Sequence, residues 1–362
     1  MVPGVALSAG LRHPLAGFAA LRAAYRTRGV NEARPAPPPP PPPARFPVLH
    51  LADGRAAVKP APFRYARASS LAEAIALLAA GHGDAKVLAG GQSLVPMLNM
   101  RLVRPAVLVD VNGLHELIGI TPTPDGGLRI GALTRHAELA ASPVVIERAS
   151  LLAEAARHVG HAAIRNQGTL GGSLAHADPA AELPAALVAL DARVHVTGPR
   201  GAREIAADAL FLGLLTTTLE PDEILTAIEV PAQPPGWGFV EIARRPGDFA
   251  LAGVAAVVHV GRPLTLPSPP HGGEGASEAR CEMVRLVGFG VGDRPVRLTR
   301  AERLLASAPL DAETAARAGA AAGPDCDPPS DVHGSADYRR HLATVLAERA
   351  LLQAGARLAG RP

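Results

Sequence analysis

The chain has 362 residues, of which 48% are hydrophobic, so it is long enough for two domains that each bury a core. Its net charge is only +3 and no basic run is interleaved with aromatic residues, which argues against nucleic-acid binding. The two cysteines, Cys281 and Cys326, cannot supply four thiolates to an iron–sulfur cluster or a structural zinc, and a disulfide framework is not expected. A reducing, cytoplasmic compartment is therefore predicted.

Residues 1–57 are predicted to be a disordered or mis-assigned leader. They are rich in arginine, poor in acids, and contain a proline run, Pro37 to Pro43, that would be extended and unable to join a core. A targeting peptide is the alternative, although the apolar patch at 15–21 is too short for a good secretory signal. No run of about 18 apolar residues occurs anywhere, so no membrane span is expected.

A first folded domain is predicted over residues 58–235. Ser70 and Glu73 form a capping box before an apolar helix that Gly81 can end. A buried strand, a helix and a second buried strand follow, at 86–89, 94–100 and 106–110. This order predicts a βαβ-like unit whose first turn lies at the carboxyl end of a strand, where ligands tend to bind in open sheets.

The rest of this domain is predicted as a mixture of strands and helices. Thr134 is expected to cap a short helix, and a longer helix over 144–158 is expected to end at Gly160. The other predicted elements are a strand at 127–131, a helix at 183–190 and strands at 193–197 and 223–230. The prolines and glycine at 233–236 indicate a domain boundary.

A smaller α+β domain is predicted over residues 236–358. Its predicted elements are three strands, at 239–243, 254–260 and 281–289, and three helices, at 300–307, 312–322 and 336–358. Residues 262–280 are rich in proline and glycine, which do not pair well in a sheet. We interpret them as an inserted surface loop.

Two glycine motifs carry the chemistry of the first domain. Each has adjacent glycines followed by a hydroxyl residue, a pattern that lets backbone N–H groups approach a phosphate. One such pair alone is most simply a tight turn, but two in one domain suggest a diphosphate held from both sides. No Gly-x-Gly-x-x-Gly follows a strand and no Gly-Lys-Ser/Thr occurs, so neither a Rossmann site nor a nucleoside triphosphatase is indicated. The first glycine motif is Val87, Leu88, Ala89, Gly90, Gly91, Gln92, Ser93 and Leu94, and the second is Thr169, Leu170, Gly171, Gly172 and Ser173.

Three stretches in this order resemble the FAD-binding medium subunit of molybdenum hydroxylases. They are Ala89-Gly-Gly-Gln-Ser-Leu94, the run from Ile164 through Ala-His-Ala-Asp-Pro to Pro184, and Arg244-Arg-Pro-Gly-Asp-Phe-Ala250. That family includes the carbon monoxide dehydrogenase flavoprotein subunit and the FAD domain of xanthine dehydrogenase. The resemblance covers residues 58 to the C-terminus apart from the insertion. It implies an α+β fold, with a two-subdomain FAD-binding domain of the vanillyl-oxidase (PCMH-like) type followed by the small α+β domain with its three-stranded sheet.

The resemblance also implies a cofactor site. The two glycine motifs would hold the FAD diphosphate, Glu182 would take the place of an acid near the ribose and adenine, and Leu225 would line the cofactor. Where the family often has a lysine near the flavin, this chain has Glu241, which leaves that contact open. Asp248 and Phe249 belong to a signature that is structural as much as functional. No catalytic residue and no metal ligand is implied.

The implied function is electron transfer within a complex. FAD here would receive electrons from the [2Fe–2S] clusters of a small subunit, after a large subunit has hydroxylated the substrate at a molybdenum cofactor, and would pass them to NAD, a quinone, a ferredoxin-like protein or oxygen. The family forms heterotrimers, and the isolated chain would hydroxylate nothing. Two alternatives stay open: a stand-alone FAD-dependent oxidoreductase, and a non-catalytic assembly or scaffold subunit that has lost the cofactor.

Several polar residues outside the motifs have simpler interpretations. Asp110 is more plausibly an N-cap or turn acid than a ribose ligand. A metal cluster of the three histidines 158, 161 and 176 with Asp178 is disfavoured by loose spacing, although His161 or His176 could contact a cofactor atom. Cys326 has no paired base, and the acids at 220–223 are most simply a solvated loop.

Overall fold

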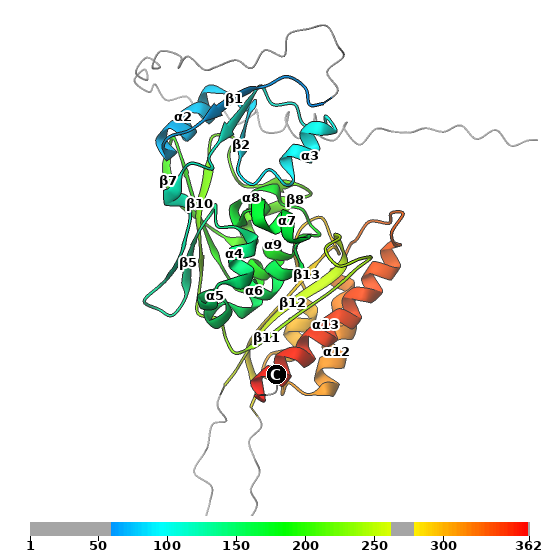
Figure 1. Ribbon diagram of the computed structural model, residues 1–362. Coiled ribbons are helices and arrows are strands. Elements are labelled where there is room, and N and C mark those ends of the chain that lie inside the picture. The colour runs from blue at the N-terminus through cyan, green and yellow to red at the C-terminus, as the bar shows by residue number, and fades with distance from the viewer. Residues whose placement is uncertain (1–58, 262–278, 361–362) are drawn as a thin grey trace, which may run out of the picture. The chain divides into compact units, whose positions relative to one another are not determined.

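The computed structural model describes residues 59–261 and 279–360, so the predicted leader and most of the predicted insertion lie outside the described residues. The described part begins with a parallel sheet in the order β1-β3-β2. Its elements are β1 (Arg64–Arg67), α2 (Leu71–Ala80), β2 (Ala85–Leu88), α3 (Leu94–Asn99) and β3 (Val107–Asp110). The predicted βαβ unit is confirmed, whereas β1 was not predicted (Figure 1).

The cap of α2 follows the capping box only in part. Ser70 Oγ accepts a hydrogen bond from the Glu73 N–H at 3.2 Å, as expected. The Glu73 carboxylate reaches one residue further back than expected and accepts from the Ser69 N–H at 2.8 Å. Both contacts satisfy N–H groups at the start of the helix, which have no partner within it.

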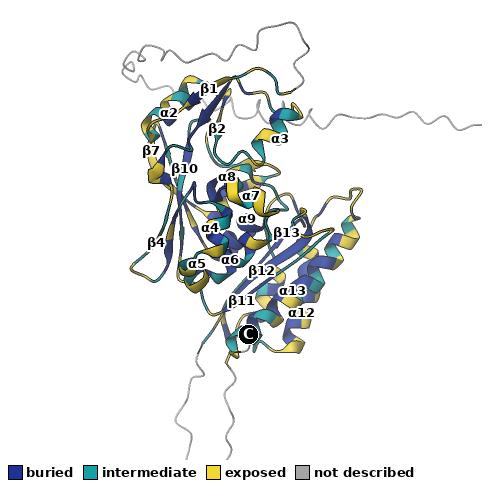
Figure 2. Ribbon diagram, in the orientation of Figure 1, coloured by how far each residue is buried: buried dark blue, intermediate teal, exposed yellow. Residues whose placement is uncertain are grey.

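A five-stranded antiparallel sheet forms the second layer, in the order β4-β5-β10-β6-β7. Its strands are β4 (Ile120–Pro122), β5 (Leu128–Gly131), β6 (Arg193–Gly198), β7 (Gly201–Ala206) and β10 (Ile224–Val230), and a small hairpin pairs β8 (Phe211–Gly213) with β9 (Thr216–Thr217). The accompanying helices are η1 (His115–Leu117), α4 (His136–Ala141), α5 (Pro143–Arg148), α6 (Ser150–His158), α7 (Ala162–Gln167), α8 (Leu170–His176), α9 (Glu182–Ala189) and α10 (Ala207–Leu210). Every residue of α9 is buried, which makes it the central helix of the core (Figure 2).

Two predicted helix features in this region are wrong. Thr134 does not cap a helix; its buried hydroxyl exchanges hydrogen bonds with the backbone of Gly119 at 3.2 Å, and α4 begins after Arg135. The single helix predicted over 144–158 is two helices, because Ala149 leaves the helical region at φ −143° and ψ 53°. No proline or glycine marks that break, so the apolar pattern alone predicts one uninterrupted helix.

The third layer is an antiparallel sheet in the order β11-β12-β13-β14 with helices packed on it. Its elements are β11 (Gly236–Ala243), β12 (Ala250–Val260), β13 (Cys281–Phe289), β14 (Val296–Arg297), α11 (Thr299–Leu305), α12 (Ala312–Ala322), η2 (Gly323–Asp325) and α13 (Ala336–Leu358). The three predicted strands are confirmed, and the two-residue β14 adds a fourth that was not predicted. Among the described residues no helix is both long and apolar enough to cross a membrane.

β12 is apolar from Ala250 to Val258 because both of its faces are covered there. Ala255 and Val257 belong to the core around α9, whereas the alternate residues Val254, Ala256 and Val258 belong to the core under α13. Successive side chains of a strand point to opposite faces, so the sheet joins two cores through one continuous apolar strand.

The close approach of α13 to β11 depends on Gly238. A Cβ at this position would lie 2.7 Å from the carbonyl carbon of Ala350, a backbone atom that cannot move aside. We expect Gly238→Ala to lower the free energy of unfolding by about 1–3 kcal/mol, as for other overpacked sites. Denaturant unfolding measures this. Gly355→Ala is the matched control: a Cβ there has 3.6 Å to its nearest neighbour, and alanine should stabilise the helix slightly.

Candidate cofactor site

The first glycine motif is a loop with unused hydrogen-bond donors. It leaves the end of β2 and enters α3 through Gly91, whose φ of +71° favours glycine. Within the described part of the chain, none of the four backbone N–H groups at residues 90–93 donates a hydrogen bond to another residue. Four neighbouring donors in a half-buried loop at a strand end are therefore available to an anion.

The second glycine motif is built differently, as the junction of two helices. Thr169 is the N-cap of α8, and its Oγ1 accepts from the Gly172 N–H at 3.1 Å. The N–H groups of Leu170 and Gly171 donate to backbone carbonyls of the strand-to-helix segment 132–134, and that of Ser173 donates to Thr169 O. The sequence suggested N–H groups that could approach a phosphate; instead α7 precedes the second motif, and the motif's N–H groups at 170–173 are all paired.

The first motif packs directly on the peptide that precedes the second motif. A Cβ on Gly90 would lie 2.9 Å from Gly168 Cα and equally close to the carbonyl carbon of Gln167, so only glycine fits against this peptide. Gly171 is equally confined, because a Cβ there would lie 2.7 Å from Ala132 Cβ. The structure therefore brings together two segments that are far apart in the sequence, with the unused donors of the first motif beside the rigid second motif.

Asn112 supports the first motif and was missed by the sequence analysis. Its Nδ2 donates to Ala89 O at 2.8 Å and to Asp110 Oδ1 at 2.7 Å. Asp110 also accepts from the Asn112 N–H at 2.9 Å and from the Tyr65 hydroxyl, which confirms the turn role. Burial opposes ionisation of Asp110, but these hydrogen bonds prevail and lower its pKa. An acid followed two residues later by asparagine after a strand is a turn signal that could have pointed here.

His136 is hydrogen-bonded to the backbone at the start of the second motif. Its backbone N–H donates to Gly168 O at 3.1 Å, and its ring Nε2 lies 2.9 Å from Thr169 O. The carbonyl can only accept, so Nε2 carries the proton and the buried Nδ1 is left without a partner. Burial lowers the pKa of His136 to about 4, which keeps the ring neutral.

Glu182 lies in a buried acidic cluster at the start of α9. Burial, with a smaller contribution from the nearby charges of Glu241 and Asp178, raises its pKa to about 8, so the carboxyl is largely protonated at neutral pH. Glu241 Oε1 pairs with His158 Nδ1 at 3.0 Å, while its buried Oε2 has no partner. Glu154 and Glu241 together raise the pKa of His158 to about 9. The predicted Glu182 and the doubted Glu241 therefore share one environment.

The other candidate residues are spread over the domain. Leu225 is buried in β10, opposite Val196, and β10 packs against α8. His161 is exposed before α7, and His176 is half-buried at the end of α8. In the ranges 59–261 and 279–360, no three His, Cys, Asp or Glu side chains gather as metal ligands would.

Both cysteines are buried in the second domain. Burial raises the pKa of Cys281, and it raises that of Cys326 to about 12. Both thiols are therefore protonated at neutral pH and poor nucleophiles.

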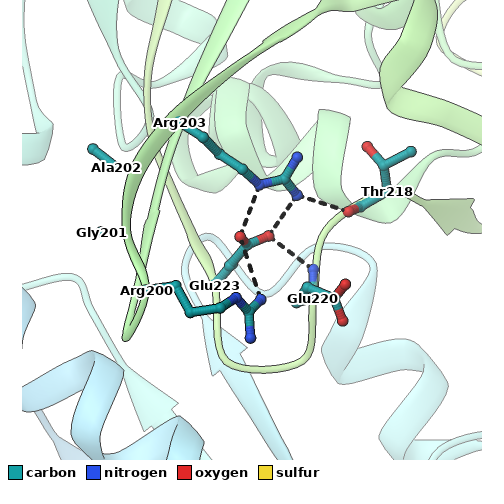
Figure 3. A pocket seen from close by; sticks show the side chains of 7 residues that line it. All are labelled: Arg200, Gly201, Ala202, Arg203, Thr218, Glu220 and Glu223. Atoms are coloured by element: carbon teal, nitrogen blue, oxygen red, sulfur yellow. Dashed lines mark hydrogen bonds and ion pairs between the residues drawn. The ribbon is translucent and has the colours of Figure 1, made fainter. Parts of the chain in front are cut away.

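The acidic turn at 220–223 is only in part the solvated loop that we expected, because Glu220 is exposed but Glu223 is not. Glu223 is buried and forms a two-pronged ion pair with Arg203, at 2.8 and 2.7 Å, while also accepting from the Glu220 N–H (Figure 3). These residues, with Arg200 and Thr218, line a pocket of about 310 Å³. None of the predicted cofactor residues lines it, and its charges already neutralise one another.

Family profiles match most of the chain. The profile described as "FAD binding domain in molybdopterin dehydrogenase" matches residues 61–233, and "CO dehydrogenase flavoprotein C-terminal domain" matches residues 237–354. The chain belongs to the FAD-binding medium-subunit family of molybdenum hydroxylases. The resemblance, the α+β fold and the FAD-binding domain expected from the motifs are thereby confirmed.

Individual relatives agree with this family. The 6-hydroxypseudooxynicotine dehydrogenase complex subunit alpha of Paenarthrobacter nicotinovorans is 41% identical over 299 residues, which are 82% of this chain and 96% of the relative. The carbon monoxide dehydrogenase medium chain of Hydrogenophaga pseudoflava is 37% identical over 305 residues, 83% of this chain and 99% of the relative.

Solved structures show the same fold. Carbon monoxide dehydrogenase from Hydrogenophaga pseudoflava, in a form lacking the Mo-pyranopterin moiety, superposes with a TM-score of 0.74 at 37% identity, covering 82% of this chain and 99% of that chain. Quinoline 2-oxidoreductase from Pseudomonas putida 86 gives 0.73 at 38% identity, with 82% and 98% covered. The chain is a medium subunit of the type found in these multi-subunit oxidoreductases.

Because His136 is neutral in the folded chain, the free energy of unfolding depends on pH. Its pKa is about 4 in the folded chain and 6.5 when unperturbed, so the unfolded state binds the proton first as the pH falls. The stabilisation is complete above pH 6.5 and is lost as the pH falls toward 4, by about 3 kcal/mol at most. The variant His136→Gln keeps a hydrogen-bond donor but does not titrate. Between pH 7 and pH 4, we expect its free energy of unfolding to fall by about 3 kcal/mol less than that of the wild type. Equal losses in urea unfolding would refute this.

The cluster around His158 makes a second pH prediction. Glu241→Gln removes one of the two carboxylates that hold the imidazolium, so the pKa of His158 should fall from about 9 while Glu154 keeps it above 6.5. NMR titration of the imidazole measures this, and His158→Gln identifies the resonance. Arg129→Gln, which breaks an ion pair with Glu229 instead, is the control and should leave His158 unchanged.

Proposed function

We propose that this chain holds FAD across its two glycine motifs and serves as the electron outlet of a molybdenum hydroxylase. The observation that carries the proposal is the packing of Gly90 on the Gln167–Gly168 peptide, just before the second motif. This contact has room only for glycine, and it lies beside the four N–H groups at 90–93 that donate to no described residue. FAD supplies the redox chemistry, and the protein supplies binding, orientation and electrostatics.

The residues divide the work of binding. The N–H groups at 90–93 would donate to diphosphate oxygens, and the absence of a side chain at Gly90 and Gly91 permits their close approach. The second motif, with its backbone already paired, would form a fixed wall and contribute the hydroxyl groups of Thr169 and Ser173. Glu182 and Leu225 complete the proposed site as a buried carboxyl and an apolar surface.

The partners are part of the same proposal. Relatives are called a medium chain of carbon monoxide dehydrogenase, a medium subunit of nicotine 6-hydroxylase and an FAD-binding subunit of xanthine dehydrogenase. By this likeness the chain would join a [2Fe–2S] small subunit and a molybdenum-cofactor large subunit in a cytoplasmic heterotrimer, with NAD, a quinone or oxygen as acceptor. The division into domains at 58–235 and 236–358 is supported by the ranges of the two family profiles.

Co-purification tests the proposal against its alternatives. The chain is purified with the products of neighbouring genes and its visible spectrum is recorded. Flavin and iron–sulfur absorption with bound partners is expected. Flavin alone with substrate turnover would favour a stand-alone oxidoreductase, and a complex without flavin would favour a scaffold subunit.

A glycine substitution tests the site itself. Gly90→Ala places a Cβ against the Gln167–Gly168 peptide, so the motifs must separate and FAD retention should fall at least about tenfold. Gly113→Ala is the matched control, because its Cβ meets only the flexible Arg67 side chain at 3.4 Å. Retention is measured as the flavin-to-protein ratio after gel filtration. Equal retention in the Gly90→Ala and Gly113→Ala variants would contradict the two-motif site.

A further inference from the structure

Arg135 links the two glycine motifs through its side chain. Its Nη2 donates to Asn112 Oδ1 at 2.9 Å, and its Nη1 donates to the carbonyl of Gln167. Asn112 in turn donates through Nδ2 to Ala89 O at 2.8 Å. A continuous line of hydrogen bonds therefore runs from the first motif, through one amide and one guanidinium, to the peptide on which Gly90 packs.

Every group in this line has a fixed orientation. The Asn112 amide cannot flip, because Oδ1 accepts from Arg135 and Nδ2 donates to Ala89 and Asp110. Arg135 is anchored at its backbone, which pairs with Thr169 in an isolated bridge at the start of α4. The planar guanidinium can reach two acceptors at once, which a lysine ammonium cannot do with the same geometry.

We propose that Arg135 and Asn112 are positioning residues that hold the two glycine motifs at the separation the FAD diphosphate needs. This inference rests on the proposed function. Without the bridge, apolar packing would still hold the first motif near the second, but the hydrogen-bonded link between them would be lost and the four N–H groups would be less precisely oriented. The expected consequence is faster loss of FAD from a chain that still folds.

A different role for Arg135 would be simple attraction between its charge and the phosphates. The two roles separate on Arg135→Lys, which keeps the charge and loses the two-pronged contact. The bridge predicts that Arg135→Lys and Arg135→Ala are about equally impaired. Charge attraction predicts that Arg135→Lys resembles wild type.

The experiment measures FAD affinity and dissociation rate on the purified full-length chain by flavin fluorescence. Arg135→Ala, Arg135→Lys and Asn112→Ala should each weaken binding roughly tenfold or more, as expected for a lost hydrogen bond to a charged group. Arg129→Ala, which removes an arginine from an unrelated ion pair, is the control and should bind as wild type does. Melting of the cofactor-free variants shows whether each one folds.

A double-mutant cycle tests the connection between the two residues. If Asn112 and Arg135 act through one bridge, the double variant should be no worse than the poorer single variant, whereas independent sites would give multiplied losses. Multiplied losses, or wild-type affinity in Arg135→Lys, would overturn the inference. If Asn112→Ala fails to fold, Arg135→Lys still decides. A wild-type chain that binds no FAD would refute the proposed function, whereas tight binding unchanged by Arg135→Ala would refute only the bridge.

Discussion

The site depends on one steric constraint, the lack of room for any side chain where Gly90 packs on the Gln167–Gly168 peptide. This contact sets the distance between the loop that follows β2 and the junction of α7 with α8. The parallel sheet can present its loop to the helical segment only if their backbones touch, and backbones touch only through glycine. The absence of a side chain at Gly90 lets the two backbones lie close together. Hydrogen bonds from Asn112 to the first motif and from His136 to the second then hold them there.

The polar side chains at the start of α9 and the end of α6 are buried or half-buried, so their pKa values depend strongly on their neighbours. Glu182 keeps its proton because burial disfavours the charge, and His158 keeps its own because two carboxylates favour it. One carboxyl, that of Glu182, and one imidazole, that of His158, thus keep protons at neutral pH that they would largely lose in water. A group of this kind near a redox cofactor adjusts its electrostatics without taking part in bond making.

The sequence predicted the larger elements well, since their signals are local. The apolar runs of β12, β13 and α13 and the cap of α2 are visible in a few residues of sequence. Short edge elements such as β1 and β14 carry too little pattern to be recognised. The break at Ala149 leaves no compositional mark either.

Within the site, the motifs themselves were visible as glycine pairs, but their partners were not. Arg135 and Asn112 lie outside both motifs and meet only when the fold is complete, and whether an N–H group is free or paired is likewise a tertiary property. For the same reason Glu223 could not be recognised as buried, because its partner Arg203 comes from another strand. The sequence therefore identifies the glycines of the site, but which polar groups lie next to them is known only from the folded structure.

The difference between the two motifs also sets where hydration changes on binding. In the free chain, water must satisfy the four donors at residues 90–93, because half-buried N–H groups are costly to leave unpaired. The second motif needs little such hydration, since its N–H groups at 170–173 are bonded within the protein. In the proposed binding mode, cofactor loading would exchange water for phosphate oxygen on this single short loop, whereas the second motif would be dehydrated little.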